Sequence, residues 1–435
     1  MEHYYQKEIE CASPEQIKSW QDERLVRQVR HVWDNVPYYR AKMEAAGLTP
    51  DDIKSRDDLY KLPFLSKADL RDAYPYGLLA VPLKDCVRIH STSGTTGKRV
   101  VAFYTKEDID LWEDCCARAI AAAGGTVEDV CQVAYGYGLF TGGLGLHGGA
   151  ERIGATVIPA STGNTARQIT MLQDYGSTML CCTPSYALYI GETLEKNHIP
   201  LSTIHLKAGL FGAEPWTLGM KEEIEKRLGI KAYDIYGLSE ISGPGVSFGC
   251  DGSDGLHVND DHFLIEIVDP VTGKVLPDGE KGEVVFTTLT KRALPLLRYN
   301  THDISSITHE RCACGRTLTR MARITGRSDD MLIIRGVNVF PSQIESVLLS
   351  VGQVEPYYMI LVDRVNNLDV MEIKVELSAD AFSDRVRGIE ELEAKIRASI
   401  ESTLGISAKV TFVEPSSLPR SEGKAKRVID NRTLR

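Results

Sequence analysis

From about residue 85 the chain alternates strand-like segments with amphipathic helical ones, and this alternation restricts the fold more than any other feature. The segment CVRIH (86–90) has the period of a strand, and VVAFYT (100–105) follows it after a polar loop. Thr105 and Asp108 have the spacing of a capping box, which predicts that a helix begins directly after the second strand. The segment 177–197 repeats the order of strand and helix. The sequence therefore predicts an α/β fold.

The chain of 435 residues is too long for one ordinary core, so we expect two or three domains. The segment TGRSDDMLIIRGVNVFPSQIE (325–345) is typical of a domain boundary: a charged stretch leads to a short apolar strand, and Pro341 then begins a helix. Beyond it, three strand-like segments and a helix near 388–403 predict a compact α+β unit of roughly a hundred residues.

Charge, hydropathy and cysteine usage exclude several classes of protein. The net charge of −10 argues against a nucleic-acid partner, because neutralising a phosphate backbone needs a basic face. No apolar run reaches the roughly 18 residues of a membrane span, and the polar start is not a secretory signal. The ten cysteines are then expected to be free thiols in a reducing compartment. We therefore expect no nucleic acid, no membrane and a cytoplasmic location.

The loop STSGTTGKR (91–99) gathers glycines and hydroxyl side chains around Lys98. Gly94 and Gly97 are too close together for a Walker A loop, and a strand-like segment follows instead of a helix. Backbone N–H groups, hydroxyls and a lysine still suit a polyphosphate. From these residues alone, a phosphate-binding loop and a flexible hairpin turn both remain open.

The loop resembles the phosphate loop of the adenylate-forming superfamily, which includes the acyl-CoA synthetases, and further motifs of that superfamily follow in order. YDIYGLSE (233–240) resembles its aromatic-Gly-x-x-Glu motif, and LRYNTHD (297–303) resembles its Arg-Tyr-x-Thr-x-Asp motif. TGRSDDMLIIRG (325–336) is similar to the hinge segment, and LPRSEGKAKR (418–427) is similar to the C-terminal lysine motif. FGAEPW (211–216), RGVNVFPSQIE and the short length narrow the resemblance to the phenylacetate–CoA ligase family.

The resemblance implies a fold with two domains and a hinge. A large N-terminal adenylation domain of several subdomains with mixed sheets would span residues 1–327. In this superfamily the acid is first converted to an acyl-adenylate, and the acyl group is then transferred to a thiol. A hinge would lie at 328–330 around Asp329, because these two half-reactions use different orientations of the small domain. A small, mobile α+β domain would span residues 331–435.

The resemblance also assigns a nucleotide site for ATP and AMP. The loop at 91–98 would hold the β- and γ-phosphates, and Glu240 would hold Mg²⁺, a hard cation that prefers oxygen ligands. Asp303 would accept hydrogen bonds from both ribose hydroxyls, and Arg327 would reach the same ribose. Tyr236 would stack on adenine, and the GAEP backbone would flank the base. The remaining implied nucleotide-binding residues are Ser91, Ser93, Gly94, Thr95, Thr96, Gly97, Lys98, Gly212, Ala213, Glu214, Pro215, Asp234, Gly237 and Ser239.

Lys424 is the implied catalytic lysine. By composition alone it lies in a basic C-terminal stretch of the kind that is most often a solvated tail. In the family the equivalent lysine bridges the carboxylate and the α-phosphate, a task that suits a point charge on a long flexible stem. Gly336 would line the tunnel for the pantetheine arm of coenzyme A, where the absence of a side chain admits the thiol.

The pocket for the acid is implied near AYGYGLFTGG (134–143). The resemblance places Tyr135 and Phe140 beside an aryl side chain, and aromatic faces suit an aryl guest. Packing in the core explains these two residues nearly as well.

Two short segments contain a candidate metal site. Cys250 and His257 lie in GCDGSDGLH, and Cys312 and Cys314 lie one residue apart in ERCACGRT. Three thiolates and an imidazole would complete a tetrahedral structural zinc site. Several members of the family carry a similar cluster, and others lack it. His262 and His302 are substitutes if His257 points away. Reduced cysteines without a ligand, and a redox role, are the alternatives.

The resemblance implies an ATP-dependent enzyme that ligates an aryl or arylacetic acid, with phenylacetate favoured, to coenzyme A through an acyl-adenylate. The alternatives are adenylation of another small aromatic or heteroaromatic acid, with transfer to coenzyme A or to a carrier-protein thiol, and a nucleotide-binding protein with a decayed site. Every motif residue is present, although Arg99 replaces the proline common after Gly-Lys. Because family members are often dimeric, a homodimer is also compatible with the resemblance.

Overall fold

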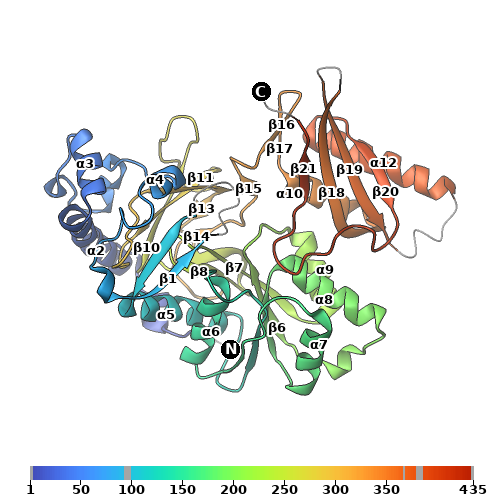
Figure 1. Cartoon of the computed structure of the whole chain (residues 1–435), viewed down its shortest axis with the longest axis horizontal. Coiled ribbons are helices and arrows are strands. Elements are labelled where there is room, and N and C mark those ends of the chain that lie inside the picture. Colours follow the sequence, from blue (N-terminus) through green and yellow to red (C-terminus); the bar gives the residue numbers. More distant parts are fainter. Residues whose placement is uncertain (1–2, 93–98, 366–367, 379–385, 433–435) are drawn as a thin grey trace. The chain divides into compact units, whose positions relative to one another are not determined.

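The computed structural model describes residues 3–92, 99–365, 368–378 and 386–432 (Figure 1). The chain divides into two compact units, and each is described by itself. The first unit comprises Met1–Cys182, Pro200–Ala213 and Ile230–Arg323. The second comprises Thr183–Ile199, Glu214–Gly229 and Ile324–Arg435.

The first unit begins with helices and then alternates strands with helices. Its helices are α1 (Lys7–Glu10), α2 (Pro14–Asn35), α3 (Pro37–Ala45), α4 (Lys67–Asp72), α5 (Lys106–Ala122), α6 (Gly142–Arg152) and α7 (Thr165–Asp174). Short 3-10 turns are η1 (Pro50–Asp52), η2 (Arg56–Lys61), η3 (Leu83–Asp85) and η4 (Leu201–Thr203). No helix in the described part of the chain combines the length and the apolar character that a membrane crossing requires.

A nine-stranded mixed sheet forms the centre of the first unit. Its strands, in spatial order, are β13 (Ile307–Thr308), β14 (Arg320–Met321), β9 (Ser253–Val258), β8 (Gly243–Cys250), β7 (Lys231–Leu238), β6 (Ala208–Gly212), β5 (Met179–Cys182), β3 (Val130–Val133) and β4 (Thr156–Ile158). Strands β4, β3, β5, β6 and β7 are parallel, and the sheet continues with antiparallel pairs from β8 onward. Helices α5 and α6 pack against this sheet. The predicted mixed α/β class is therefore confirmed.

Two smaller antiparallel groups complete the first unit. One is the hairpin of β1 (Cys86–Ser91) and β2 (Val101–Thr105). The other contains β10 (Phe263–Val268), β11 (Gly282–Thr288) and β12 (Tyr299–Ser305). Helix α5 follows β2 directly, and Thr105 and Asp108 form the predicted capping box: Thr105 Oγ1 accepts from the Asp108 amide at 3.1 Å, and Asp108 accepts from the Thr105 amide at 2.9 Å.

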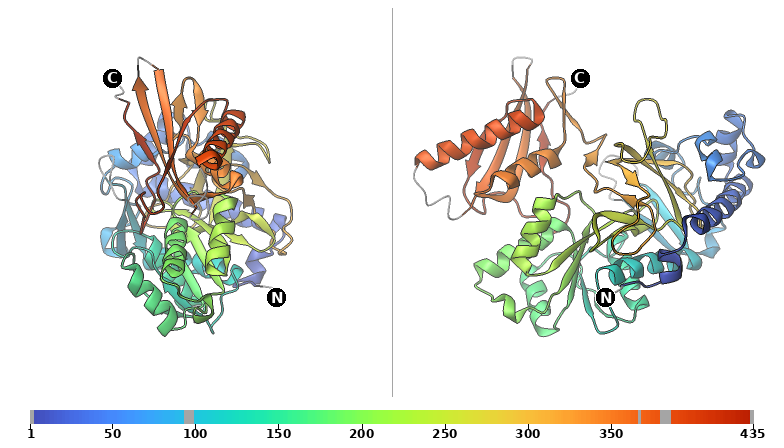
Figure 2. Two further views of the ribbon diagram at one scale, coloured as in Figure 1. Left: turned by 90° about the vertical axis from the view of Figure 1, so that its right-hand side faces the viewer. Right: turned by 180° about the vertical axis from the view of Figure 1, so that it is seen from behind.

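The second unit contains a four-stranded sheet with helices on one face, as the back view in Figure 2 shows. Its elements are α8 (Pro184–Lys196), α9 (Leu218–Leu228), β15 (Gly326–Arg327), β16 (Leu332–Ile334), β17 (Val337–Val339), α10 (Pro341–Val351), β18 (Val354–Val365), β19 (Leu368–Leu377), α12 (Val386–Leu404), β20 (Lys409–Val413) and β21 (Val428–Asp430). The sheet order is β20-β19-β18-β21. Along α12, Leu392, Ile396, Ile400 and Leu404 recur every four residues and are buried, which is the apolar stripe that a helix needs to cover a sheet.

Candidate nucleotide site and metal centre

Tyr236 and Asp303 form the most direct link between two of the predicted motifs. Tyr236 lies on β7 and Asp303 on β12, and the Tyr236 hydroxyl donates a hydrogen bond of 2.6 Å to Asp303 Oδ2. The Tyr236 ring also stacks on Phe286 of β11, with ring centroids 6.0 Å apart. Motifs more than sixty positions apart in the sequence therefore meet beside the carboxyl end of a parallel strand, where α/β sheets bind their ligands.

Glu240 lies in the turn that follows β7, and its side chain is almost fully buried, with 3% exposed. The ammonium group of Lys67, in the first turn of α4, lies 3.5 Å from Glu240 Oε1. The turn is closed by hydrogen bonds from the Ile241 and Ser242 amides to the Leu238 carbonyl, at 3.1 and 3.2 Å. The buried carboxylate is therefore held in a short, hydrogen-bonded turn with a cation beside it.

A second lysine, Lys291, also contacts the Glu240 turn and is buried. Its Nζ donates to the Ile241 carbonyl at 2.9 Å and lies 3.6 Å from the centroid of the Tyr104 ring. Burial lowers the pKa of Lys291 to about 7. Neither lysine was predicted from the sequence. Lys67 follows Ser66 of a capping box with Asp69, which could have placed it at a helix start, whereas nothing local marked Lys291.

The phosphate-loop candidates are only partly described. Ser91 ends β1; its amide donates to the Leu139 carbonyl at 2.9 Å, and its buried Oγ has no hydrogen-bond partner among the described residues. The Thr92 amide donates to the Val100 carbonyl at 3.0 Å, so the segment connects two antiparallel strands. The other predicted residues of this loop lie outside the described residues: Ser93, Gly94, Thr95, Thr96, Gly97 and Lys98.

The residues expected beside adenine lie on β6 and β7 or directly after them. Gly212 is the last residue of β6 and Ala213 follows it. Asp234 of β7 pairs with Arg323 at 3.3 Å, and Ser239 Oγ lies 3.2 Å from Thr141 Oγ1. At Gly237 a Cβ would lie 1.7 Å from the Gly243 carbonyl oxygen on β8, so only glycine fits at this approach of two strands. Since Gly212 of β6 pairs with Ile235 of β7, it lies beside the part of β7 that carries Asp234 and Gly237.

The two candidate acid-pocket residues differ in their surroundings. Tyr135 is buried in the hydrophobic core of the first unit, with 6% exposed, whereas Phe140 is 49% exposed. Core packing is therefore an adequate explanation for Tyr135, and the exposed ring of Phe140 has no such explanation. Their roles in acid binding stay predictions.

The remaining predicted residues lie in the second unit. Lys424 is exposed, between β20 and β21. Arg327 Nε and Nη2 donate to the two carboxylate oxygens of Asp329, each at 2.8 Å, so the expected ribose-binding and hinge residues form an ion pair. Pro215 is exposed and precedes α9.

Gly336 shapes a tight turn between β16 and β17. Arg335 and Gly336 are the two turn residues, with φ of 50° and 82°, and positive φ at both positions is the geometry of a type I′ hairpin. Glycine adopts this conformation without strain. A backbone requirement therefore accounts for glycine here, in addition to the role in coenzyme A binding that the resemblance implies.

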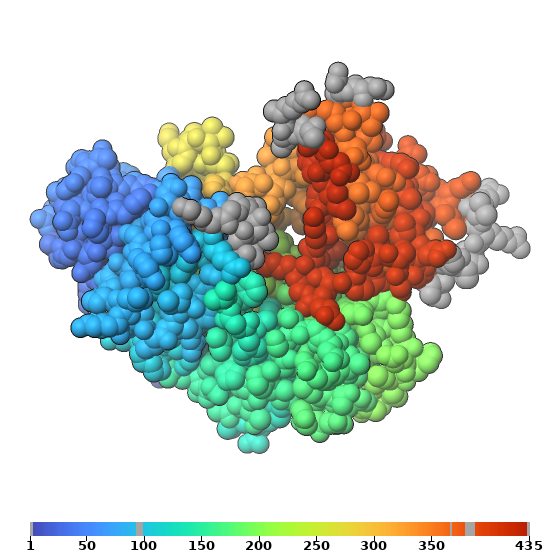
Figure 3. Space-filling view, in the orientation of Figure 1, coloured from blue at the N-terminus to red at the C-terminus, as the bar shows by residue number. Residues whose placement is uncertain are grey.

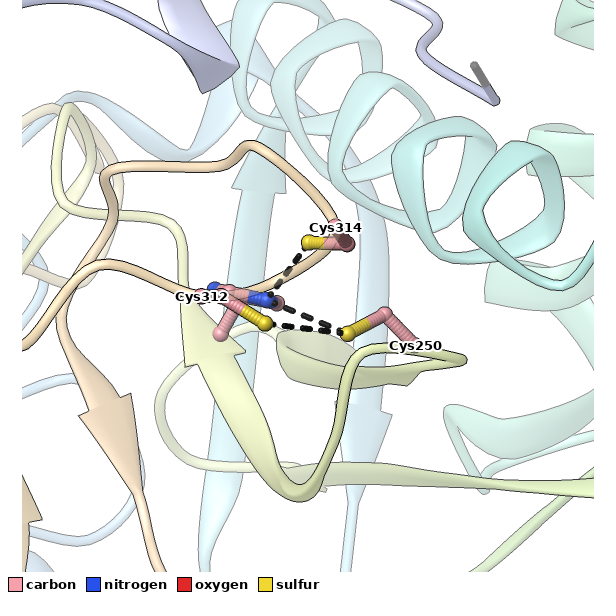
Figure 4. Close-up of side chains that lie close together, drawn as sticks. Cys250, Cys312 and Cys314 are labelled. Atoms are coloured by element: carbon pink, nitrogen blue, oxygen red, sulfur yellow. Dashed lines mark hydrogen bonds between the residues drawn. The ribbon is translucent and has the colours of Figure 1, made fainter. Parts of the chain in front are cut away.

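The four candidate zinc ligands come together in the first unit, although Cys250 and His257 are far from the Cys-x-Cys segment in sequence (Figure 4). Their ligand atoms all lie within 4.8 Å of one another. Cys250 Sγ lies 3.3 Å from His257 Nε2 and 3.7 Å from Cys312 Sγ, and Cys314 Sγ lies 3.3 Å from His257 Nε2. Tetrahedral zinc, with bonds of about 2.3 Å to sulfur and 2.0 Å to nitrogen, separates its ligand atoms by about 3.5–3.8 Å. The residues therefore fit this ion.

Groups around the cluster donate hydrogen bonds to its sulfurs. The Gly252 amide donates to Cys250 Sγ at 3.3 Å, and Arg316 Nη1 donates to Cys314 Sγ at 3.6 Å. A hydrogen bond from the Cys250 thiol is the largest of several contacts that lower the pKa of Cys314. The Cys314 carbonyl accepts from the Tyr4 hydroxyl at 2.6 Å, so the cluster loop also holds the N-terminal segment. These contacts therefore favour a thiolate at Cys314, whereas the contact with Cys314 and burial raise the pKa of Cys250.

The substitute histidines lie away from this cluster and have other partners. His262 contacts Thr290 Oγ1 at 3.0 Å and Asp261 at 3.0 Å. His302 Nδ1 lies 3.1 Å from Glu283 Oε1. Among the residues that the structure describes, the histidine grouped with the three cysteines is His257.

Comparison with known proteins defines the class. A model of the AMP-binding enzyme family matches residues 17–289, and a model of the AMP-binding enzyme C-terminal domain matches residues 336–432. The chain is thus an adenylate-forming enzyme by fold and by family.

Curated relatives narrow the class to one family. The chain is 47% identical over 442 residues to the phenylacetate-coenzyme A ligase of Thermus thermophilus, covering 98% of this chain and 99% of the relative. It is 49% identical over 428 residues to the phenylacetate-coenzyme A ligase of Escherichia coli, covering 98% and 97%. The chain belongs to the phenylacetate–CoA ligase family, and the resemblance predicted from its motifs is confirmed.

Solved structures show the same fold. A crystal structure of 2-hydroxyisobutyryl-CoA ligase in the postadenylation state, in complex with R3-HIB-AMP, is 29% identical and aligns with a TM-score of 0.92, covering 98% of this chain and 92% of that chain. A structure of the same ligase with 2-HIB-AMP and CoA in the thioesterification state is 30% identical and aligns with a TM-score of 0.73, covering 99% and 93%.

Proposed function

We propose that the chain activates phenylacetate with ATP to phenylacetyl-adenylate and pyrophosphate, and then transfers the acyl group to coenzyme A with release of AMP. The class of reaction, AMP-forming ligation of a carboxylic acid to a thiol, follows from membership of the family. The choice of phenylacetate rests on full-length relatives named phenylacetate-coenzyme A ligase at 47–49% identity. The observation that supports a nucleotide site most directly is the hydrogen bond between Tyr236 and Asp303.

Tyr236 and Asp303 would bind the adenosine. Because Asp303 Oδ2 already accepts the Tyr236 hydroxyl, the carboxylate is held in one orientation, and its remaining lone pairs can accept from the two ribose hydroxyls. Phe286 packs against the Tyr236 ring and limits its rotation, so the phenol is preorganised to stack on a purine. Fixing the adenosine in this way lowers the entropic cost of aligning the α-phosphate of ATP with the carboxylate of the acid substrate.

Glu240 would hold Mg²⁺, which would neutralise charge on the phosphates of ATP. A buried carboxylate is costly without a cation, and Lys67 supplies one at 3.5 Å. Ser91 and the loop at 93–98 would contact the β- and γ-phosphates of ATP. Lys424 would bridge the carboxylate of the acid substrate and the α-phosphate. Phe140, with its exposed ring, would contact the aryl group of the acid.

The domain boundaries are part of the same proposal. An adenylation domain at 1–327, a hinge at 328–330 and a lid domain at 331–435 would let Lys424 serve the first half-reaction and Gly336 the second. The Arg327–Asp329 ion pair spans the proposed boundary and would be one of the contacts that break when the hinge turns.

A substrate panel tests this function. We expect phenylacetate to give the highest kcat/KM for pyrophosphate release in a panel of phenylacetate, indoleacetate, benzoate and aliphatic acids, and we expect added coenzyme A to raise the rate of AMP formation. Release of AMP that is indifferent to coenzyme A would instead indicate a carrier-protein thiol as acceptor. A higher kcat/KM for another acid would contradict the choice of phenylacetate and leave the reaction class intact.

We also propose that Cys250, His257, Cys312 and Cys314 bind a structural zinc ion. Four protein ligands would fill the tetrahedron, so the ion would have no open position for substrate and its role would be stability. The ion would fix the loop that carries Cys314, and through Tyr4 and the ion pair between Arg316 and Glu10 it would fix the N-terminal segment.

Replacing one ligand tests the zinc proposal. We expect Cys312→Ser to lose about one equivalent of zinc and to lower the midpoint of thermal unfolding by roughly 5–10 °C, because a closed zinc site contributes directly to folding. Metal analysis and calorimetry measure the two effects. The matched control is Cys86→Ser, since Cys86 is a free cysteine outside the cluster and should leave both values unchanged. Wild-type protein that contains no zinc would contradict the proposal.

A further inference from the structure

The N-terminus of helix α8 has two side-chain caps. Thr183 is the N-cap, and its Oγ1 accepts a hydrogen bond from the Tyr186 amide at 3.3 Å. The Ser185 amide, one position earlier, donates to Glu214 Oε1 at 2.8 Å. Glu214 comes from the GAEP segment, at a distance of almost thirty positions in the sequence. The N-terminus of α8 is therefore capped by a carboxylate from another motif, and a negative charge is favourable at the positive end of a helix dipole.

The segment that carries Lys424 binds to the same two caps. The Ala425 amide donates to the second carboxylate oxygen of Glu214, Oε2, at 2.8 Å. The Thr183 hydroxyl donates to the Gly423 carbonyl at 3.1 Å. The residues on either side of Lys424 are thus both fixed to the N-terminus of α8, one through Thr183 and the other through Glu214.

The flanks of the segment are fixed by arginines. Arg420 donates to Glu192 and to Glu376 at 2.7–2.8 Å, and Arg427 lies 3.5 Å from Glu345. Lys424 itself is exposed and makes no hydrogen bond or ion pair with any residue that the structure describes. In Figure 3 the stretch that precedes the C-terminal residues, in dark red, lies on the face turned toward the viewer. The backbone at Lys424 is therefore held while its ammonium group stays free.

We propose that Glu214 is a positioning residue for Lys424: its carboxylate docks the backbone of the lysine segment on α8, with one oxygen for each of two amide donors, and so sets where the ammonium group reaches in adenylate formation. This inference rests on the proposed function, because it takes Lys424 as the catalytic lysine. It adds a role for the side chain in a motif that was expected to act through its backbone.

The chemistry of the side chain explains why a carboxylate suits this position. Each amide has one proton to donate, and a carboxylate offers an acceptor oxygen to each, with the added strength of a charged acceptor. A carboxamide has one acceptor oxygen, so glutamine can satisfy one amide while its own N–H group faces the other. Alanine removes both hydrogen bonds, so the Ser185 and Ala425 amides could then be hydrogen-bonded only by water.

A purely structural role for Glu214 predicts a different effect on the two half-reactions. If Glu214 did no more than cap α8, its loss would weaken the fold and would reduce both half-reactions equally. A positioning role affects the half-reaction in which Lys424 acts and leaves the other half-reaction nearly unchanged. The comparison of half-reactions therefore separates the two.

The test measures both half-reactions in Glu214→Ala and Glu214→Gln. We expect Glu214→Ala to slow adenylate formation, followed by ATP–pyrophosphate exchange, roughly 10- to 100-fold, since small misplacements of a catalytic group have effects of this size. Thioester formation from preformed phenylacetyl-adenylate should change less than about threefold, and Glu214→Gln should fall between alanine and wild type. Equal losses in both half-reactions would overturn the proposal. The control is Glu222→Gln, because Glu222 is an exposed residue of α9.

Hydrogen exchange supplies a readout that needs no substrate. In Glu214→Ala we expect amides of residues 418–427 to exchange about tenfold faster or more, while the thermal midpoint stays close to that of Glu222→Gln. Unchanged exchange in this segment would refute the docking role whatever the activity. If wild-type enzyme failed to activate phenylacetate, the proposed function would fail while this experiment would still decide the role of Glu214.

Discussion

Replacing Lys424 with alanine is expected to slow adenylate formation by roughly 100- to 1,000-fold and to leave thioester formation from preformed adenylate nearly intact. Negative charge accumulates on the oxygens of the α-phosphate as the acid attacks, and a positioned ammonium group stabilises that charge. In the second half-reaction the thiol attacks the acyl carbon and the phosphorus does not become pentacoordinate, so we expect this step to depend much less on the lysine. Single-turnover assays of the two half-reactions measure the difference.

Lys426→Ala is the matched control for this experiment. Lys426 lies two positions away on the same segment and is exposed like Lys424, so its loss removes a similar charge without removing the proposed catalytic group. A decrease of the same size in both half-reactions of Lys424→Ala, or the same decrease in Lys426→Ala, would mean that the general positive charge of the segment matters and that Lys424 has no specific role.

Replacing Glu240 with glutamine is expected to lower adenylate formation by roughly 100-fold and to raise the Mg²⁺ concentration needed for half-maximal rate. The carboxylate is buried, and its charge is matched by Lys67 at 3.5 Å, so the neutral amide would both weaken metal binding and leave this lysine without its partner. Titration of the initial rate with Mg²⁺, at saturating ATP and acid, measures the shift.

The control for Glu240 is Glu280→Gln, at an exposed position in the same unit. It should have the rate and the Mg²⁺ dependence of wild type. If Glu240→Gln showed an unaltered Mg²⁺ dependence together with a lower thermal midpoint, Glu240 would be a structural residue of the turn after β7, and the metal would have to bind elsewhere.

Local patterns predicted most of the secondary structure, because those signals act over a few residues. Thr105 and Asp108 predicted the start of α5, and the spacing of apolar residues predicted β1, β2 and α12. The grouping of α8 and α9 with the C-terminal unit was not predicted, because it depends on contacts between segments far apart in the chain.

In the candidate site, too, the individual motif residues could be predicted from the sequence, whereas the contacts between distant residues could not. Motif resemblance selected Tyr236 and Asp303 separately, and the hydrogen bond between them emerged only from the folded sheet. The same holds for Lys67 and Lys291 around Glu240 and for the carboxylate of Glu214, since each acts on a distant backbone or side chain. For the cysteines, Cys-x-Cys alone is a weak indication of a metal site. The structure strengthens the prediction, because it places Cys250 and His257 next to this segment.

A crystal structure with phenylacetate and an ATP analogue whose link between the α- and β-phosphates cannot be cleaved shows directly whether adenosine binds at Tyr236 and Asp303. We expect electron density for both ribose hydroxyls within hydrogen-bond distance of the Asp303 carboxylate, with the adenine ring on the face of Tyr236. Nucleotide density at any other location, with Tyr236 still bonded to an otherwise vacant Asp303, would contradict it.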